Sequence, residues 1–109
     1  MTSDRVAREF IAENPNCWRC GRYGVQCHEI ACGPARKKAR QERCSMLALC
    51  PDCHRKVHDY SLWPIARQLA LKLIRDPKHF DPERVNELRG RSRFAIELFE
   101  IVEFLEMPI

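Results

Sequence analysis

Cys50-Pro51-Asp52-Cys53-His54-Arg55-Lys56-Val57-His58 is the stretch that decides the fold. Cys50 and Cys53 are separated by two residues and form a turn of the size that a tetrahedral metal ion requires. A matching pair, Cys17 and Cys20, lies upstream. Two such pairs in one short chain predict a single structural zinc site, to which each pair contributes half of the ligands.

The length and the cysteine content limit the class of protein. A chain of 109 residues suits one domain, residues 1–109, with a modest core that a structural zinc ion would stabilise. Seven cysteines are an odd number, which fits metal-bound thiols in a reducing compartment better than disulfides. The N-terminus lacks an apolar signal segment, and no stretch reaches the roughly 20 apolar residues of a membrane span. We therefore expect an intracellular, cytoplasmic protein without a membrane partner.

Positive charge gathers in the cysteine-rich half. Residues 1–58 hold 11 Lys or Arg and 6 Asp or Glu, whereas residues 59–109 hold 8 and 9. Residues 33–43 contribute five basic side chains and one acidic side chain. A loop of this composition beside a metal site favours contacts with phosphates, so the DNA backbone is the expected partner and a solvated charged loop is the alternative. The expected phosphate ligands are Arg36, Lys37, Lys38, Arg40 and Arg43.

The pattern of apolar residues predicts an α+β fold. A first helix is expected to end near Glu13. Residues 25–30 and 45–49 are predicted to pair as strands, and a helix is expected from Cys50 to about Asp59. This order of strand, loop, strand and helix makes residues 17–58 a zinc-bound core.

Residues 63–106 are predicted to form a helical extension of that core. The helix that opens it is expected to expose Arg67, Lys72 and Arg75. The last helix, about 92–106, is expected to bury one apolar face, which serves either the core or a protein partner such as a second copy of the chain. The residues of that face are Phe94, Leu98, Phe99, Ile101, Val102 and Leu105.

Three histidines lie close to the predicted zinc site. His54 and His58 are four residues apart and share one helix face, and His28 lies on the first predicted strand. If this strand packs across the helix, the three imidazoles converge, with Glu29 beside them. An open site of imidazole and carboxylate suits a second divalent ion, such as Mg²⁺, Mn²⁺ or Zn²⁺, that polarises a phosphodiester. The alternative is that His54 and His58 are ordinary polar residues of an exposed helix.

These motifs resemble the HNH endonuclease family, whose ββα-metal fold holds one metal ion between a hairpin and a helix. The resemblance covers residues 17–58, and the order of the motifs is similar to that in small phage and prophage HNH proteins. It implies a metal-dependent nuclease that cuts or nicks DNA in the host cytoplasm, with His54 and His58 as ligands of the catalytic ion. The stretches that carry the resemblance are Cys17-Trp18-Arg19-Cys20, Cys27-His28-Glu29-Ile30, and Ser45-Met46-Leu47-Ala48-Leu49-Cys50-Pro51-Asp52-Cys53-His54 with His58.

Two positions depart from the family pattern. The family ends its first strand with a metal ligand followed by a general-base histidine, and here the pair is His28-Glu29. Either His28 is a ligand and Glu29 stands at the base position, or His28 is itself the base. Ser45 replaces the asparagine that usually orients the base. These departures leave a second interpretation open, a non-catalytic zinc module that binds nucleic acid or protein on an HNH-derived scaffold. A redox role for the other cysteines is the weakest alternative, because they form no CxxC pair.

Overall fold

The computed structural model describes residues 2–31, 42–90 and 94–108, and these ranges contain five α-helices and one two-stranded sheet. The elements in chain order are α1 (Thr2–Glu13), β1 (Gln26–Glu29), β2 (Met46–Leu49), α3 (Pro51–Val57), α4 (Ile65–Arg75), α5 (Pro82–Arg89) and α6 (Leu98–Glu103). The short 3-10 turns are η1 (Arg43–Ser45), η2 (Pro77–His79) and η3 (Phe104–Glu106). This content confirms the predicted α+β class. Within the described ranges, no helix is both long enough and apolar enough to cross a membrane.

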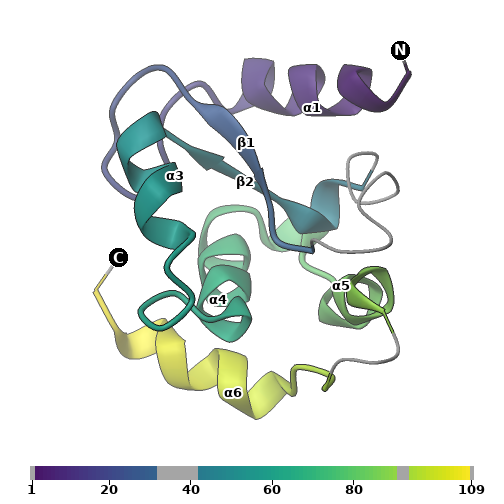
Figure 1. The fold of residues 1–109 in the computed structure, drawn as a ribbon. Helices are drawn as coiled ribbons and strands as arrows, with labels where there is room; N and C mark the ends of the chain where they lie inside the picture. Colours follow the sequence, from purple (N-terminus) through teal and green to yellow (C-terminus); the bar gives the residue numbers. More distant parts are fainter. Residues whose placement is uncertain (1, 32–41, 91–93, 109) are drawn as a thin grey trace.

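The two strands form an antiparallel hairpin near the centre of the fold. Gln26 pairs with Leu49 and Glu29 pairs with Met46, so both strands lie within the predicted limits. All four residues of β2 are buried, because α1 lies on one side of the hairpin and α4 on the other (Figure 1). A short, uninterrupted apolar run is typical of a strand covered in this way.

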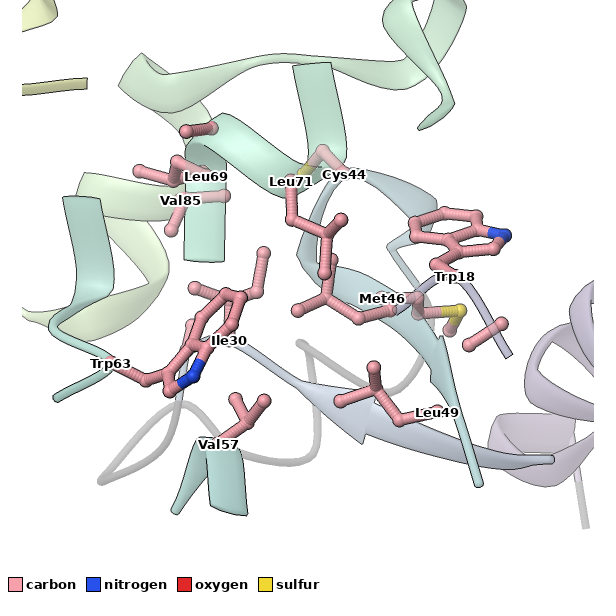
Figure 2. Packing of buried hydrophobic residues seen from close by; sticks show 14 of the residues in the cluster. Trp18, Ile30, Cys44, Met46, Leu49, Val57, Trp63, Leu69, Leu71 and Val85 are labelled. Atoms are coloured by element: carbon pink, nitrogen blue, oxygen red, sulfur yellow. The ribbon is translucent and has the colours of Figure 1, made fainter. Parts of the chain in front are cut away.

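The core joins the hairpin to the helices on either side of it (Figure 2). Trp18 packs edge-on against Phe10 of α1, with ring centroids 5.4 Å apart. Val57 of α3 and Trp63 are buried in the same core with Leu69 of α4. Because Trp18 lies between the two members of the first cysteine pair, the packing of the core also holds that pair in place.

One residue of α4 is buried although the sequence predicts that it is exposed. The helical pattern predicts an exposed Lys72, but its side chain is fully buried. Its Nζ donates hydrogen bonds to the Met46 carbonyl, at 3.0 Å, and to Asp76 Oδ2, at 2.8 Å, and lies 5.1 Å from the ring centres of Phe10 and Trp18. The aliphatic stem fills space in the core while Asp76 compensates the charge, and helical periodicity gives no sign of such a pair.

The last helix is shorter than the sequence predicts. Glu97 and Glu100 form a capping box, which starts α6 six residues later than expected. Phe94, predicted to be buried, is 96% exposed, whereas Ile101 is fully buried. The apolar face is therefore divided between the core and the surface. Its other exposed members are Leu98, Phe99 and Val102.

The predicted phosphate-binding loop lies mostly outside the described residues. This applies to Arg36, Lys37, Lys38 and Arg40. Arg43, which begins η1, is described, and its guanidinium pairs with the carboxylate of Glu13 at the end of α1. DNA binding by this loop stays a prediction.

Candidate metal centres

The first cysteine pair lies on a tight turn between α1 and β1. The Cys17 N–H donates to the Arg22 carbonyl at 2.8 Å, and the Gly21 N–H donates to the Cys17 carbonyl at 2.9 Å. Gly21 has a φ of 81°, which lies in the left-handed region that glycine adopts at little steric cost. The turn places Cys17 and Cys20 in one metal-sized group with the second pair.

The second cysteine pair lies at the start of α3. Cys50 is the N-cap of the helix, and Cys53 lies in its first turn after Pro51. Proline suits this position because its fixed φ fits the helix and its missing N–H would have no helical partner there. The His54 N–H donates to the Cys50 carbonyl at 2.8 Å, so the helical turn that presents the thiols also leads into the first imidazole.

The four thiols form a cluster whose dimensions fit zinc. All four sulfur atoms lie within 4.8 Å of one another, and Cys20 Sγ and Cys50 Sγ are 3.6 Å apart. A tetrahedral zinc ion with Zn–S bonds of about 2.3 Å places its sulfur ligands about 3.8 Å apart. The cluster can therefore hold a metal ion such as zinc with four protein ligands, which leaves no open position.

The thiols of the cluster differ in acidity. Burial raises the pKa of Cys17, but hydrogen bonds from backbone N–H groups, including that of Arg19, outweigh burial and lower the pKa to about 6. Burial and then the neighbouring thiols raise the pKa of Cys53 to about 12. Four thiolates at such short distances repel one another, and a coordinated metal ion removes this repulsion and deprotonates its thiol ligands.

Three imidazoles form a second cluster. His28 comes from β1, whereas His54 and His58 come from the last turn and the C-cap of α3. The ring centroid of His28 lies 5.0 Å from that of His54 and 5.1 Å from that of His58, and the latter two are 4.8 Å apart. One nitrogen of each ring lies within 4.8 Å of the others. The strand packs across the helix and brings the three predicted histidines together.

The nitrogens of the α3 pair have the spacing of metal ligands. His54 Nε2 and His58 Nε2 are 3.2 Å apart, and two nitrogens bound tetrahedrally to zinc at about 2.0–2.1 Å lie about 3.3 Å apart. His54 Nδ1 lies 2.7 Å from Oε1 of Gln26. Because a carbonyl oxygen can only accept, Nδ1 carries the proton and donates it, which leaves a lone pair on Nε2.

Gln68 of α4 fixes the third imidazole. This side chain is fully buried, and its Nε2 donates to the Trp63 carbonyl at 3.0 Å and to the Val57 carbonyl at 3.5 Å. The two contacts turn its Oε1 toward His28, whose Nε2–H donates to it at 2.8 Å. A neutral imidazole with its proton on Nε2 keeps a lone pair on Nδ1. That Nδ1 is buried and has no hydrogen-bond partner among the described residues, so it is the nitrogen left for a metal.

Burial favours the neutral form of two imidazoles of the cluster, and the third imidazole is exposed to solvent. Burial lowers the pKa of His28 to about 4, which outweighs the opposite effect of the bond to Gln68. Burial and then the charge of His58 lower the pKa of His54. Neutral imidazole is the form that binds metals. His58 is exposed, so the cluster is accessible from solvent on that side.

Two residues that the family pattern associates with the catalytic base do not lie in the histidine cluster found in the described residues. Successive side chains of a strand face opposite sides of a sheet, so Glu29 faces away from His28, and the histidine cluster found in the described residues does not include it. Ser45 is fully buried, and its hydroxyl accepts the Ala31 N–H at 2.9 Å across the end of the hairpin. The residue that orients His28 is Gln68.

Sequence reasoning missed Gln68, which lies 40 residues from His28 along the chain. The signal that could have found it is its position on the buried face of α4, next to Leu69. A buried side-chain amide needs hydrogen-bond partners, and a buried histidine whose ring N–H needs an acceptor is a suitable one.

Two other described cysteines lie outside the thiol cluster. Burial raises the pKa of both Cys27 and Cys44 to about 11. A thiol reacts as its thiolate, so these residues are poor candidates for a redox function near neutral pH.

The comparison with known proteins assigns no family. No family model matches the chain, and neither a curated protein nor a solved structure matches it. The two clusters are therefore interpreted from their geometry and from the chemistry of their donor atoms.

Proposed function

We propose that the chain is a metal-dependent endonuclease of the HNH type that cuts or nicks DNA by hydrolysing phosphodiester bonds. One observation carries this proposal: three imidazoles from β1 and α3 converge beside a four-thiol cluster, and the buried Nδ1 of His28 has no partner among the described residues. The order of hairpin and helix around the imidazoles supports the same proposal, because it is the order that the resemblance implies.

The two clusters have different roles in this proposal. The four thiols use every position of a tetrahedral ion and so hold a structural zinc, whereas three imidazoles leave a position for substrate or water. His28, His54 and His58 would hold a divalent ion, which would supply positive charge to polarise the phosphodiester and stabilise the leaving oxygen. Imidazole is a good ligand for zinc, while Mg²⁺ prefers oxygen ligands, so we expect zinc rather than Mg²⁺ at this site.

His28, His54 and His58 act as ligands in this proposal. The alternative, in which His28 is the general base, is disfavoured because a buried imidazole with a pKa of about 4 is a weak proton acceptor near neutral pH. Glu29 occupies the base position of the family pattern, but its side chain faces away from His28. A general base must lie within hydrogen-bond reach of the attacking water, so we do not assign Glu29 as the base in this proposal.

Plasmid cleavage tests the proposal. The zinc-loaded protein is incubated with supercoiled plasmid and with Zn²⁺, Mn²⁺ or Mg²⁺ in separate reactions. We expect nicked or linear product from the wild type and none from His54→Ala. His79→Ala is the matched control, because His79 bonds to Asp76 and lies outside the cluster. Intact plasmid with all three ions, or equal cleavage by the wild type and His54→Ala, would refute the nuclease.

A non-catalytic zinc module that binds nucleic acid or protein is the second candidate function. It is favoured because the histidine cluster found in the described residues includes no carboxylate, and because Ser45 is engaged with Ala31. It predicts DNA binding without cleavage, and that binding should survive His54→Ala.

A further inference from the structure

A groove of about 420 Å³ lies between α3, the cysteine turn and the start of α4. At about 100° per residue, Lys56 lies on the face of α3 opposite His54, so this groove is separate from the histidine cluster. Four of its lining side chains are cationic and one is anionic. The charged residues are Arg19, Arg55, Lys56, Asp59 and Arg67.

The single anionic side chain of the groove offsets only part of the charge of the four cations. Asp59 Oδ1 accepts hydrogen bonds from the N–H of Ser61, at 3.1 Å, and from its hydroxyl, at 2.6 Å. These bonds lower the pKa of Asp59, so it is a carboxylate, but it is turned toward its own loop. Of the cations, Arg55 pairs with Asp52, which is not part of the groove lining.

The other three cations form no ion pair within the described ranges, and they are Arg19, Lys56 and Arg67. Arg67 is held in place, because its guanidinium carbon lies 3.9 Å from the ring centre of Trp63 and its Nη1 donates to the Leu62 carbonyl at 2.7 Å. Burial and then the charge of Arg19 lower the pKa of Arg67. Arg19 is partly engaged with the thiol cluster, because its Nη1 donates to Cys53 Sγ at 3.5 Å. The groove is therefore net positive, and Lys56 and Arg67 are the cations that it leaves available to an anion.

We propose that this groove binds phosphate groups of a nucleic-acid backbone. The choice of partner rests on the nuclease proposal, but the site does not depend on the loop at residues 33–43. A guanidinium fixed by stacking presents its remaining donors in a plane that suits phosphate oxygens, and Lys56 adds an exposed ammonium beside it. Because the groove faces away from the imidazoles, it holds a neighbouring part of the backbone rather than the phosphate that is cleaved.

Salt-dependent DNA binding tests this site. Binding of a fluorescent duplex to the zinc-loaded chain is measured at several salt concentrations for Lys56→Gln, Arg67→Gln and the double variant. Lys78→Gln is the matched control, since Lys78 is exposed on η2, outside the groove lining, and the charge change is the same. The slope of log K against log salt is negative, and each lost phosphate contact reduces its magnitude by about 0.9. We expect this decrease for each groove variant and a smaller one for the control.

Two controls separate the outcomes. Repeating the measurement in a His54→Ala background removes cleavage, so a decrease in slope there supports the groove even if the nuclease proposal fails. Lys56 is exposed, so Lys56→Gln keeps the test valid if Arg67→Gln loses zinc or helicity. Equal slopes for Lys56→Gln and Lys78→Gln would overturn the proposal. So would inorganic phosphate that binds the wild type as tightly as the duplex does, because the groove would then be a small-anion site.

Discussion

The thiol cluster and the histidine cluster share the short helix α3 but differ in what positions their donor atoms. The thiols depend on local backbone geometry, namely the turn closed by Gly21 and the N-cap at Cys50. The imidazoles of His28 and His54 depend on side-chain amides, which come from β1 and from α4. Each thiol pair is therefore positioned by its local backbone, and the Trp18 N–H, which donates to the Ala48 carbonyl at 2.8 Å, helps to bring the first pair to the second. The orientation of the imidazoles depends instead on side chains from other elements.

In the proposed nuclease, this difference separates the structural metal from the catalytic one. If the thiols hold zinc, loss of a thiol would remove the link between the cysteine turn and α3. Loss of an exposed imidazole leaves the same link intact. The predictions below test whether the two clusters respond to substitution in these two ways.

Loss of the thiol-bound zinc should have the largest effect. Structural zinc contributes an apparent binding free energy of about 10–16 kcal/mol in zinc-finger peptides, which matches or exceeds the whole stability of a small domain, about 5–15 kcal/mol. We expect Cys50→Ser, or a strong chelator acting on the wild type, to abolish the cooperative thermal transition followed by circular dichroism. Cys27→Ser, at a cysteine outside the cluster, should keep its zinc and its transition. A normal transition for zinc-free Cys50→Ser would contradict the structural role.

Loss of an exposed imidazole should abolish activity while the stability is preserved. His58 is exposed at the C-cap of α3, and substitutions at such positions usually change stability by about 0.5 kcal/mol or less. We expect His58→Ala to unfold in urea at nearly the wild-type midpoint and to cleave no plasmid. A large shift of the midpoint would show that the histidine cluster also holds the fold together.

Loss of the ion pair between Lys72 and Asp76 should lower the stability, and neither cluster should lose a bound metal ion. Asp76→Asn leaves the ammonium of Lys72 buried without its carboxylate, and breaking such a pair costs about 3 kcal/mol in unfolding free energy. Burial raises the pKa of Asp76, but hydrogen bonds from Lys72 and His79 outweigh it, and the net shift is downward. The unfolded chain therefore takes up a proton first as the pH falls. The stabilisation by Asp76 is present at neutral pH and is lost as the pH falls through the folded pKa.

Urea unfolding at neutral and acidic pH, combined with zinc analysis, checks this prediction. The wild type should lose stability between the two conditions, and Asp76→Asn should lose less because it starts without the carboxylate. Loss of zinc from Asp76→Asn at neutral pH would mean that the pair supports the thiol cluster itself.

The sequence predicts the parts of this molecule that depend on short-range patterns. The CxxC spacing predicts a metal-sized group because two residues between cysteines fix the turn, and the run at 45–49 predicts a buried strand because it is uninterrupted. The convergence of His28 with His54 and His58 could be predicted only with one further assumption, that the strand packs across the helix. Metal binding by either cluster stays a prediction, although the spacings of the donor atoms fit zinc.

The parts that the sequence did not predict depend on long-range partners. Lys72 and Gln68 are polar residues on the buried face of α4, and each has a partner far away along the chain, the Met46 carbonyl for Lys72 and His28 for Gln68. Helical periodicity treats a polar residue as exposed and contains no information about such partners. The late start of α6 has a local cause, because a capping box competes with the longer apolar pattern.

Substitution of the two glutamines whose amides orient the imidazoles should have the smallest effect. The effect on metal affinity should be larger for the buried glutamine than for the exposed one. Removal of a side chain that positions a metal-bound histidine typically lowers metal affinity or activity by about 10–100-fold. Gln68 is fully buried, whereas Gln26 is exposed and water can replace it. We therefore expect Gln68→Leu to weaken Co²⁺ binding at the histidine cluster within this range and Gln26→Leu to weaken it less. The visible absorption of Co²⁺ and the ¹⁵N shifts that report the His28 tautomer provide the measurement. Equal affinities for both leucine variants would mean that the tautomer of His28 is not fixed from α4.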